Sequence, residues 1–85
     1  METTPGYYGL SSKTQLKELD NNRIGIYKVI KSRIIQKDAL KIIDIATQIK
    51  SVDPALEVTL ICTRNICSKS IALLEREGVT IELVD

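Results

Sequence analysis

Residues 57–76 read EVTLICTRNICSKSIALLER, and the rest of the chain is organised around this stretch. Residues 58–62 form a compact apolar run, which is typical of a strand covered on both faces. The polar residues 63–65 interrupt the run, and residues 66–77 then predict a helix that ends at Gly78. Functional groups of an open parallel sheet usually lie at a strand-to-helix corner of this kind. We therefore treat this corner as the first candidate site.

Periodicity predicts two further strands and one further long helix. Residues 23–31 predict the first core strand, although residues 30–35 could instead begin the next helix early. Residues 79–84 alternate between apolar and polar side chains, which predicts a strand near the edge of the sheet with one wet face. Between these strands, residues 35–50 predict a helix. Its apolar stripe consists of Ile35, Ala39, Ile42, Ala46 and Ile49.

The first residues predict an arm rather than a regular element. Residues 1–11 contain proline and glycine around two tyrosines, and we expect them to form a flexible N-terminal arm. The alternative is that Tyr7, Tyr8 and Leu10 fold back over an open face of the sheet.

A short helix is expected after this arm. Ser12 and Gln15 match a capping box, and residues 20–22 are a turn-prone cluster that ends the helix. Residues 12–85 then form a single α/β domain. Its predicted sheet is small, parallel and three-stranded, with two right-handed crossover helices (βαβαβ) and the short N-terminal helix before them.

The predicted topology leaves one sheet face open. If the three strands lie in sequence order, both crossover helices cover the same face. The apolar character of residues 58–62 on both faces indicates that something covers the other one. The candidates are the short helix, the N-terminal arm or another subunit.

Composition and charge exclude several classes of function. The 85 residues include 12 basic and 11 acidic side chains, and the net charge of +1 excludes a strongly basic domain that coats nucleic acid nonspecifically. The chain has no histidine, which excludes Ser-His and Cys-His dyads and any zinc site that uses histidine. No apolar run approaches the roughly 18 residues of a membrane span, and the N-terminus does not resemble a signal peptide. We therefore expect a cytoplasmic protein without membrane contact.

The carboxyl ends of the predicted strands form the candidate site. Parallel strands converge on one rim there, and the start of the second crossover helix adds free backbone amides. Positive charge and hydroxyl groups beside a helix N-terminus predict an anion or phosphate site. The residues expected to bind the anion are Lys31, Arg33, Arg64, Ser68 and Lys69. The simpler interpretation is that polar residues end strands because strands end at solvent.

Cysteines and carboxylates offer little support for catalysis. Cys62 and Cys67 are expected to be free thiols with structural roles, although Cys67 near a helix start could have a lowered pKa. A Mg²⁺ site needs two or three acids near one point, and the sequence places no such cluster at the rim. We expect no metal, no cofactor and no catalytic residue.

One order of elements resembles a known superfamily. Residues 24–84 begin with a hydrophobic strand that ends in Lys31-Ser32-Arg33, followed by an amphipathic helix. Next come the strand of residues 58–63 with its Arg64-Asn65 corner, a further helix and Gly78-Val79-Thr80-Ile81. This order resembles the C-terminal half of the restriction-endonuclease-like nuclease superfamily. The resemblance implies an acid, one residue and a lysine on the first strand, which hold metal and activate water.

Lys31 matches that lysine, but Val29 stands at the position of the acid and cannot bind metal. The earlier strand that supplies a catalytic aspartate in the superfamily has no counterpart in this chain. The resemblance therefore implies a degenerate or truncated member that binds but does not cut.

We thus expect a small non-enzymatic intracellular domain that binds nucleic-acid phosphate or another anion at the rim. The expected partner is a second copy of the chain in a homodimer, or a larger protein, with nucleic acid as a further candidate. Two alternatives stay open. One is a homo-oligomerisation or protein-interaction module that uses the open sheet face, and the other is a divergent nuclease-like enzyme.

Overall fold

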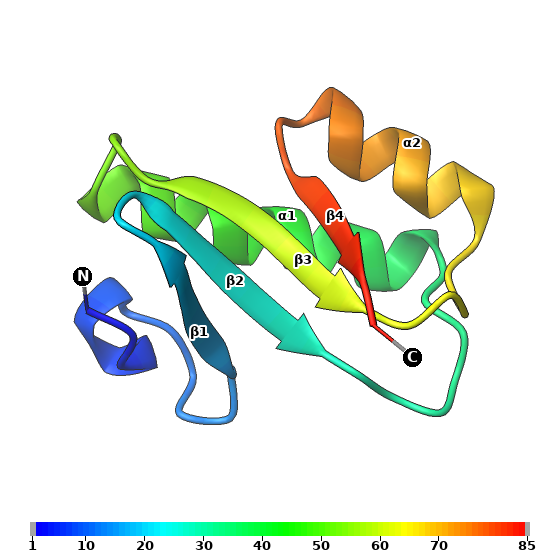
Figure 1. The fold of residues 1–85 in the computed structure, drawn as a ribbon, viewed down its shortest axis with the longest axis horizontal. Helices are drawn as coiled ribbons and strands as arrows, with labels where there is room; N and C mark the ends of the chain where they lie inside the picture. Colours follow the sequence, from blue (N-terminus) through cyan, green and yellow to red (C-terminus); the bar gives the residue numbers. More distant parts are fainter. Residues whose placement is uncertain (1, 85) are drawn as a thin grey trace.

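The computed structural model describes residues 2–84 and shows a four-stranded mixed sheet with helices packed on it (Figure 1). The strands are β1 (Leu16–Asp20), β2 (Arg23–Lys28), β3 (Glu57–Cys62) and β4 (Thr80–Leu83), in the spatial order β1-β2-β3-β4. Strands β2, β3 and β4 are parallel, whereas β1 is antiparallel to β2. The predicted α/β class is confirmed. Met1, the first residue of the predicted arm, and Asp85, the last residue of the predicted domain, lie outside the described residues.

The expected short N-terminal helix is instead the edge strand β1. Leu16 pairs with Ile26, and the turn-prone residues 20–22 close a hairpin, in which the Asn22 amide donates to the Asp20 carboxylate at 3.4 Å. A helix of two turns has little stability of its own in water. As a strand, the same residues provide partners for the backbone groups along the edge of β2. The capping-box match of Ser12 and Gln15 was therefore a misleading helical signal.

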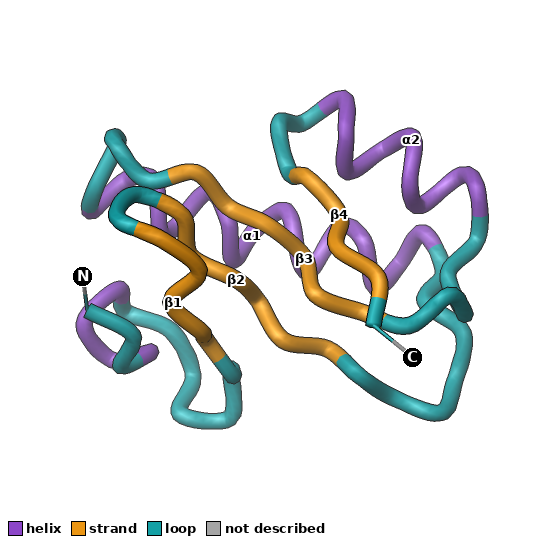
Figure 2. Tube along the Cα trace, viewed as in Figure 1, coloured by secondary structure: helices purple, strands orange, loops and turns teal. Residues whose placement is uncertain are grey.

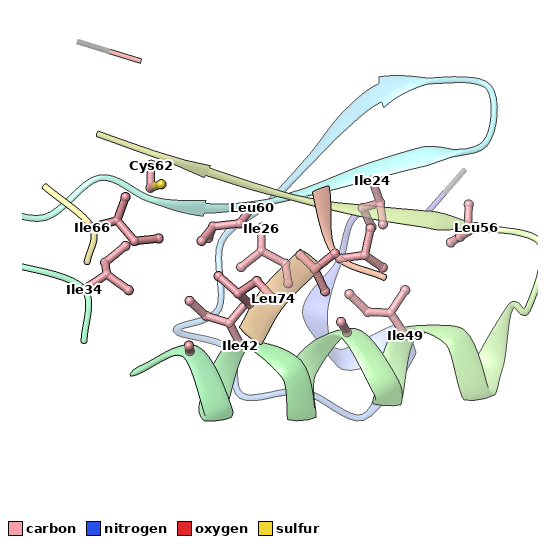
Figure 3. Packing of buried hydrophobic residues seen from close by; sticks show 14 of the residues in the cluster. Ile24, Ile26, Ile34, Ile42, Ile49, Leu56, Leu60, Cys62, Ile66 and Leu74 are labelled. Atoms are coloured by element: carbon pink, nitrogen blue, oxygen red, sulfur yellow. The ribbon is translucent and has the colours of Figure 1, made fainter. Parts of the chain in front are cut away.

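Two crossover helices cover one face of the sheet. Helix α1 (Gln36–Val52) connects β2 to β3, and helix α2 (Ser68–Arg76) connects β3 to β4. Figure 2 shows both helices against the three parallel strands, and in Figure 3 Ile42 of α1 and Leu74 of α2 lie on the same side of the sheet. No helix within residues 2–84 is long and apolar enough to cross a membrane.

The apolar stripe of α1 faces the core with one correction. Its buried residues are Ala39, Ile42, Ala46 and Ile49, as the periodicity predicts. Ile35 is 49% exposed, and Ile34 is buried in its place. The difference arises because α1 begins at Gln36, so Ile35 is the extended N-cap residue and the side chain before it turns inward.

A short 3₁₀ helix, η1 (Pro5–Tyr8), lies beside α1 at the N-terminal end of the chain. Tyr8 is 1% exposed and belongs to the hydrophobic core, and its hydroxyl donates to the Glu2 carbonyl. Gly9, in the left-handed region at a φ of 74°, ends η1. The side chain of Tyr8 thus adds to the layer that contains α1.

The sheet face opposite the helices is covered by its own side chains. Ile61 points to this face, yet it is only 3% exposed. A Cβ atom at Gly25 would lie 2.6 Å from Ile61 Cδ1 and 3.3 Å from Leu19 Cδ1, so both side chains fill the space above the glycine. The apolar residues of β3 therefore need no second subunit for their burial.

Candidate functional site

Two loops at the carboxyl ends of β2 and β3 are tied together by backbone hydrogen bonds. Ile34 and Ile66 form an isolated parallel bridge. The Ile34 amide donates to the Asn65 carbonyl at 2.9 Å, and the Cys67 amide donates to the Ile34 carbonyl at 3.1 Å. The side-chain amide of Asn65 also donates to the Lys31 carbonyl at 3.1 Å. We call these loops, residues 29–35 and 63–67, together with the first turn of α2, the carboxyl rim.

The residues expected to bind an anion all lie on this carboxyl rim. Lys31 and Arg33 are on the loop after β2, and Arg64 is on the loop after β3. Ser68 and Lys69 begin α2. All five side chains are exposed to solvent. The bridge between the loops brings their two segments to the same end of the sheet.

The N-cap of α2 is Cys67. Cys67 Sγ accepts from the Ser70 amide at 3.4 Å and lies 2.9 Å from the Ser70 hydroxyl. Ser70 is fully buried, and its hydroxyl also reaches the Ile34 carbonyl at 3.4 Å. Little in the sequence indicated this cap, because cysteine is not among the preferred N-cap residues.

The two cysteines differ in their acidity. The hydrogen bonds from the Ser70 side chain and amide lower the pKa of Cys67, and the Lys69 amide and the positive charge of Arg33 contribute in the same direction. Burial raises the pKa of Cys62, which is fully enclosed at the end of β3. Both thiols are free. Cys67 therefore has the lower pKa of the two thiols, and Cys62 is a core residue.

Within residues 2–84, no group of three or more histidine, cysteine or acidic side chains is arranged to hold a metal ion. Asp38 is the carboxylate nearest to the start of α1, and its Oδ2 accepts from the Ile35 amide at 3.1 Å. That bond satisfies an amide at the beginning of the helix. The donors of the carboxyl rim are cations, hydroxyl groups and amides, which suit an anion.

Polar groups dominate the sheet face opposite the helices, which is the alternative interaction surface expected from the sequence. Arg23 Nη2 donates to Thr59 Oγ1 at 3.5 Å, and Thr59 shares a hydrogen bond of 2.6 Å with Thr80. Arg23 also lies 3.5 Å from the Asp20 carboxylate. Glu82 is exposed on the same face. This network lacks the large apolar area that is typical of the core of a stable dimer interface.

Neither protein-family models, nor curated proteins, nor solved structures include a match to this chain. The fold and the carboxyl rim define the protein by class: a small α/β domain with a mixed sheet and a cationic end.

Proposed function

We propose that this chain is a small non-enzymatic α/β domain that binds anionic phosphate, with a nucleic-acid backbone as the ligand. The observation that carries the proposal is the pair of loops joined at Ile34 and Ile66, which bear Lys31 and Arg33 on one side and Arg64 on the other. Arginine and lysine are the side chains that contact phosphate most effectively. The first turn of α2 adds Lys69 and a helix N-terminus, which favours negative charge.

The distribution of charge along the strands supports this proposal. The net charge is only +1. However, Asp20, Asp53 and Glu57 lie at the amino ends of β2 and β3, at the opposite end of the parallel strands. At the carboxyl rim, four cationic side chains stand against Asp38 at the start of α1, so positive charge is in excess there although the whole chain is almost neutral.

Binding without cleavage follows from the types of residue at the carboxyl rim. A metal-bound water needs a cluster of ligands, and the chain contains no histidine, while residues 2–84 hold no group of three or more acidic or cysteine side chains arranged for a metal ion. The resemblance to the restriction-endonuclease-like superfamily supports the same proposal, because the position of the metal-binding acid is Val29. A domain of that kind would keep the phosphate contacts of a nuclease and lack its cleavage chemistry.

Anisotropy titrations with labelled duplex and single-stranded DNA and RNA, at two salt concentrations, test this function. If the four rim cations each neutralise one phosphate, affinity for a duplex falls roughly 150-fold between about 50 and 200 mM salt. Arg33→Ala is expected to reduce the slope of log affinity against log salt by about 0.9. Arg76→Ala, at the far end of α2, is the matched control and should leave the slope unchanged.

The proposal fails if no form of nucleic acid binds with salt dependence, or if Arg33→Ala and Arg76→Ala bind alike. Cys67 supplies a second readout within the same samples. A phosphate beside the start of α2 opposes formation of the thiolate, so bound nucleic acid should slow the reaction of Cys67 with a thiol reagent.

A further inference from the structure

A groove of about 320 Å³ lies between β2, the segment before β1 and the first half of α1. We call it the lysine groove. Its cationic lining is Lys13, Lys28 and Lys41, and its apolar lining includes Ile30, Ile42 and Ile45. Its residues differ from the anion-binding residues proposed for the carboxyl rim. Its volume lies at the lower end of the range for small-molecule sites.

The residues that line the lysine groove carry positive charge without negative charge. The residues that line it include three lysines and no carboxylate. Arg23 and Asp20 form an ion pair, and neither residue lines the groove. Lys28 is partly buried, whereas Lys13 and Lys41 are exposed. Three like charges around one space favour a ligand that carries negative charge.

The apolar part of the lysine groove is aliphatic. Among its lining residues, Ile26 and Ile42 belong to the core, whereas Ile30 is 37% exposed. Tyr27 is the aromatic residue of the lining, and side chains alternate along β2, so its ring points to the opposite face from Ile26 and Lys28. The groove thus offers branched aliphatic side chains in place of an aromatic surface on which a nucleobase could stack.

We propose that the lysine groove binds a small amphipathic carboxylate, with an aliphatic chain against Ile30 and Ile45 and the carboxylate among Lys13, Lys28 and Lys41. The chain removes exposed apolar surface from water, and the carboxylate neutralises the lysines. A purely inorganic anion leaves the isoleucines exposed, and a neutral chain leaves the lysines unpaired. Only a ligand that has both an aliphatic chain and a carboxylate covers the isoleucines and neutralises the lysines together.

Three ligands of equal chain length separate these contributions. The full chain, labelled with ¹⁵N, is titrated with decanoate below its critical micelle concentration, and amide shifts are followed; decylamine and decanol are titrated in parallel. The expected result is saturable binding of decanoate, with shifts concentrated at Lys28, Ile30 and Lys41. Decanol should bind at least several-fold more weakly, and decylamine should not saturate. Equal binding of all three ligands, or shifts spread over the whole surface, would overturn the proposal.

Two matched pairs of variants test the groove itself. Lys41→Gln should weaken decanoate binding about threefold, which is typical of one exposed charge pair, whereas Lys37→Gln, one turn earlier on α1 and outside the groove, should not. Ile30→Asp places a carboxylate in the lining and should abolish binding, whereas Ile35→Asp, at an exposed position outside the groove, should retain it. Equal behaviour within either pair contradicts the proposal. Arg33→Ala, which impairs the carboxyl rim alone, should leave decanoate binding intact.

Discussion

Cys67 and Cys62 lie five residues apart and differ completely in their surroundings. Cys62 is enclosed in the core, and Cys67 caps α2 with Ser70 and Arg33 nearby. Hydrogen bonds and positive charge stabilise a thiolate, whereas burial in apolar surroundings opposes it. The two thiols are therefore expected to separate cleanly by reactivity and by pH.

The rate of reaction of Cys67 with a thiol reagent should rise with pH through an inflection below that of a free cysteine, because the thiolate is the reacting form and its pKa is lowered. Ser70→Ala removes the largest cause of that shift, so the inflection should move to higher pH. Ser68→Ala is the control, since Ser68 makes no hydrogen bond to the sulfur. Rates measured from pH 6 to 10 with a chromogenic disulfide supply the comparison. An inflection unchanged by Ser70→Ala would show that the cap does not set the acidity, and rapid reaction of Cys62 in the folded protein would contradict its burial.

At the scale of the elements, the contact between β2 and β3 explains why a face without helices is stable. Gly25 leaves a gap on β2, and Ile61 of the neighbouring strand occupies it. Glycine in a strand interior usually weakens the strand, so its place here needs a reason from packing. The close approach of Ile61 is that reason.

Gly25→Ala should destabilise the protein by about 1–3 kcal/mol, because the added methyl group would overlap Ile61 Cδ1 and Leu19 Cδ1. That loss exceeds the gain of about 0.5–1 kcal/mol that alanine usually brings over glycine within an element. Gly6→Ala is the control, since a Cβ there meets nothing within 4 Å. Urea unfolding measures both variants.

A double-mutant cycle identifies the atom responsible. Ile61→Val removes Cδ1, so Gly25→Ala should cost less in an Ile61→Val background than in the native one. Strictly additive losses would mean that the overlap with Ile61 does not determine the effect.

At the scale of the whole molecule, stability depends on the segment before the sheet. A domain of this size is stable by only about 5–15 kcal/mol, so one buried aromatic side chain is a substantial share. Tyr8 comes from η1 and joins the core beside α1, although η1 and α1 are separated by two strands in sequence.

Tyr8→Ala is expected to cost about 3–5 kcal/mol, as for other buried aromatic side chains, and thereby to leave the protein close to unfolding. Tyr7→Ala is the matched control: Tyr7 is 59% exposed and contacts Tyr8 edge-on at 5.0 Å, so at most about 1 kcal/mol should be lost. Thermal and urea unfolding followed by circular dichroism measure the two variants. Similar small losses in both would show that η1 contributes little to the core.

The sequence by itself determined the α/β class, the positions of the two long apolar strands, the buried stripe from Ala39 to Ile49 and the helix end at Gly78. These features are local, because the period of the apolar residues and the preference of glycine for positive φ are properties of short segments. The same local patterns marked Lys31, Arg33, Arg64, Ser68 and Lys69 as exposed residues after strands.

Only the tertiary structure decided which segments meet. The spacing of Leu16 and Leu19 also fits a helix, but pairing with the edge of β2 makes this segment a strand. Cys67 caps α2 where the Ile34–Ile66 bridge holds the two loops together. The lysine groove likewise combines Lys13, Lys28 and Lys41 from three separate segments. Hydrogen bonds and burial between distant residues outweigh the weak propensity of a short segment, and no local pattern encodes those partners.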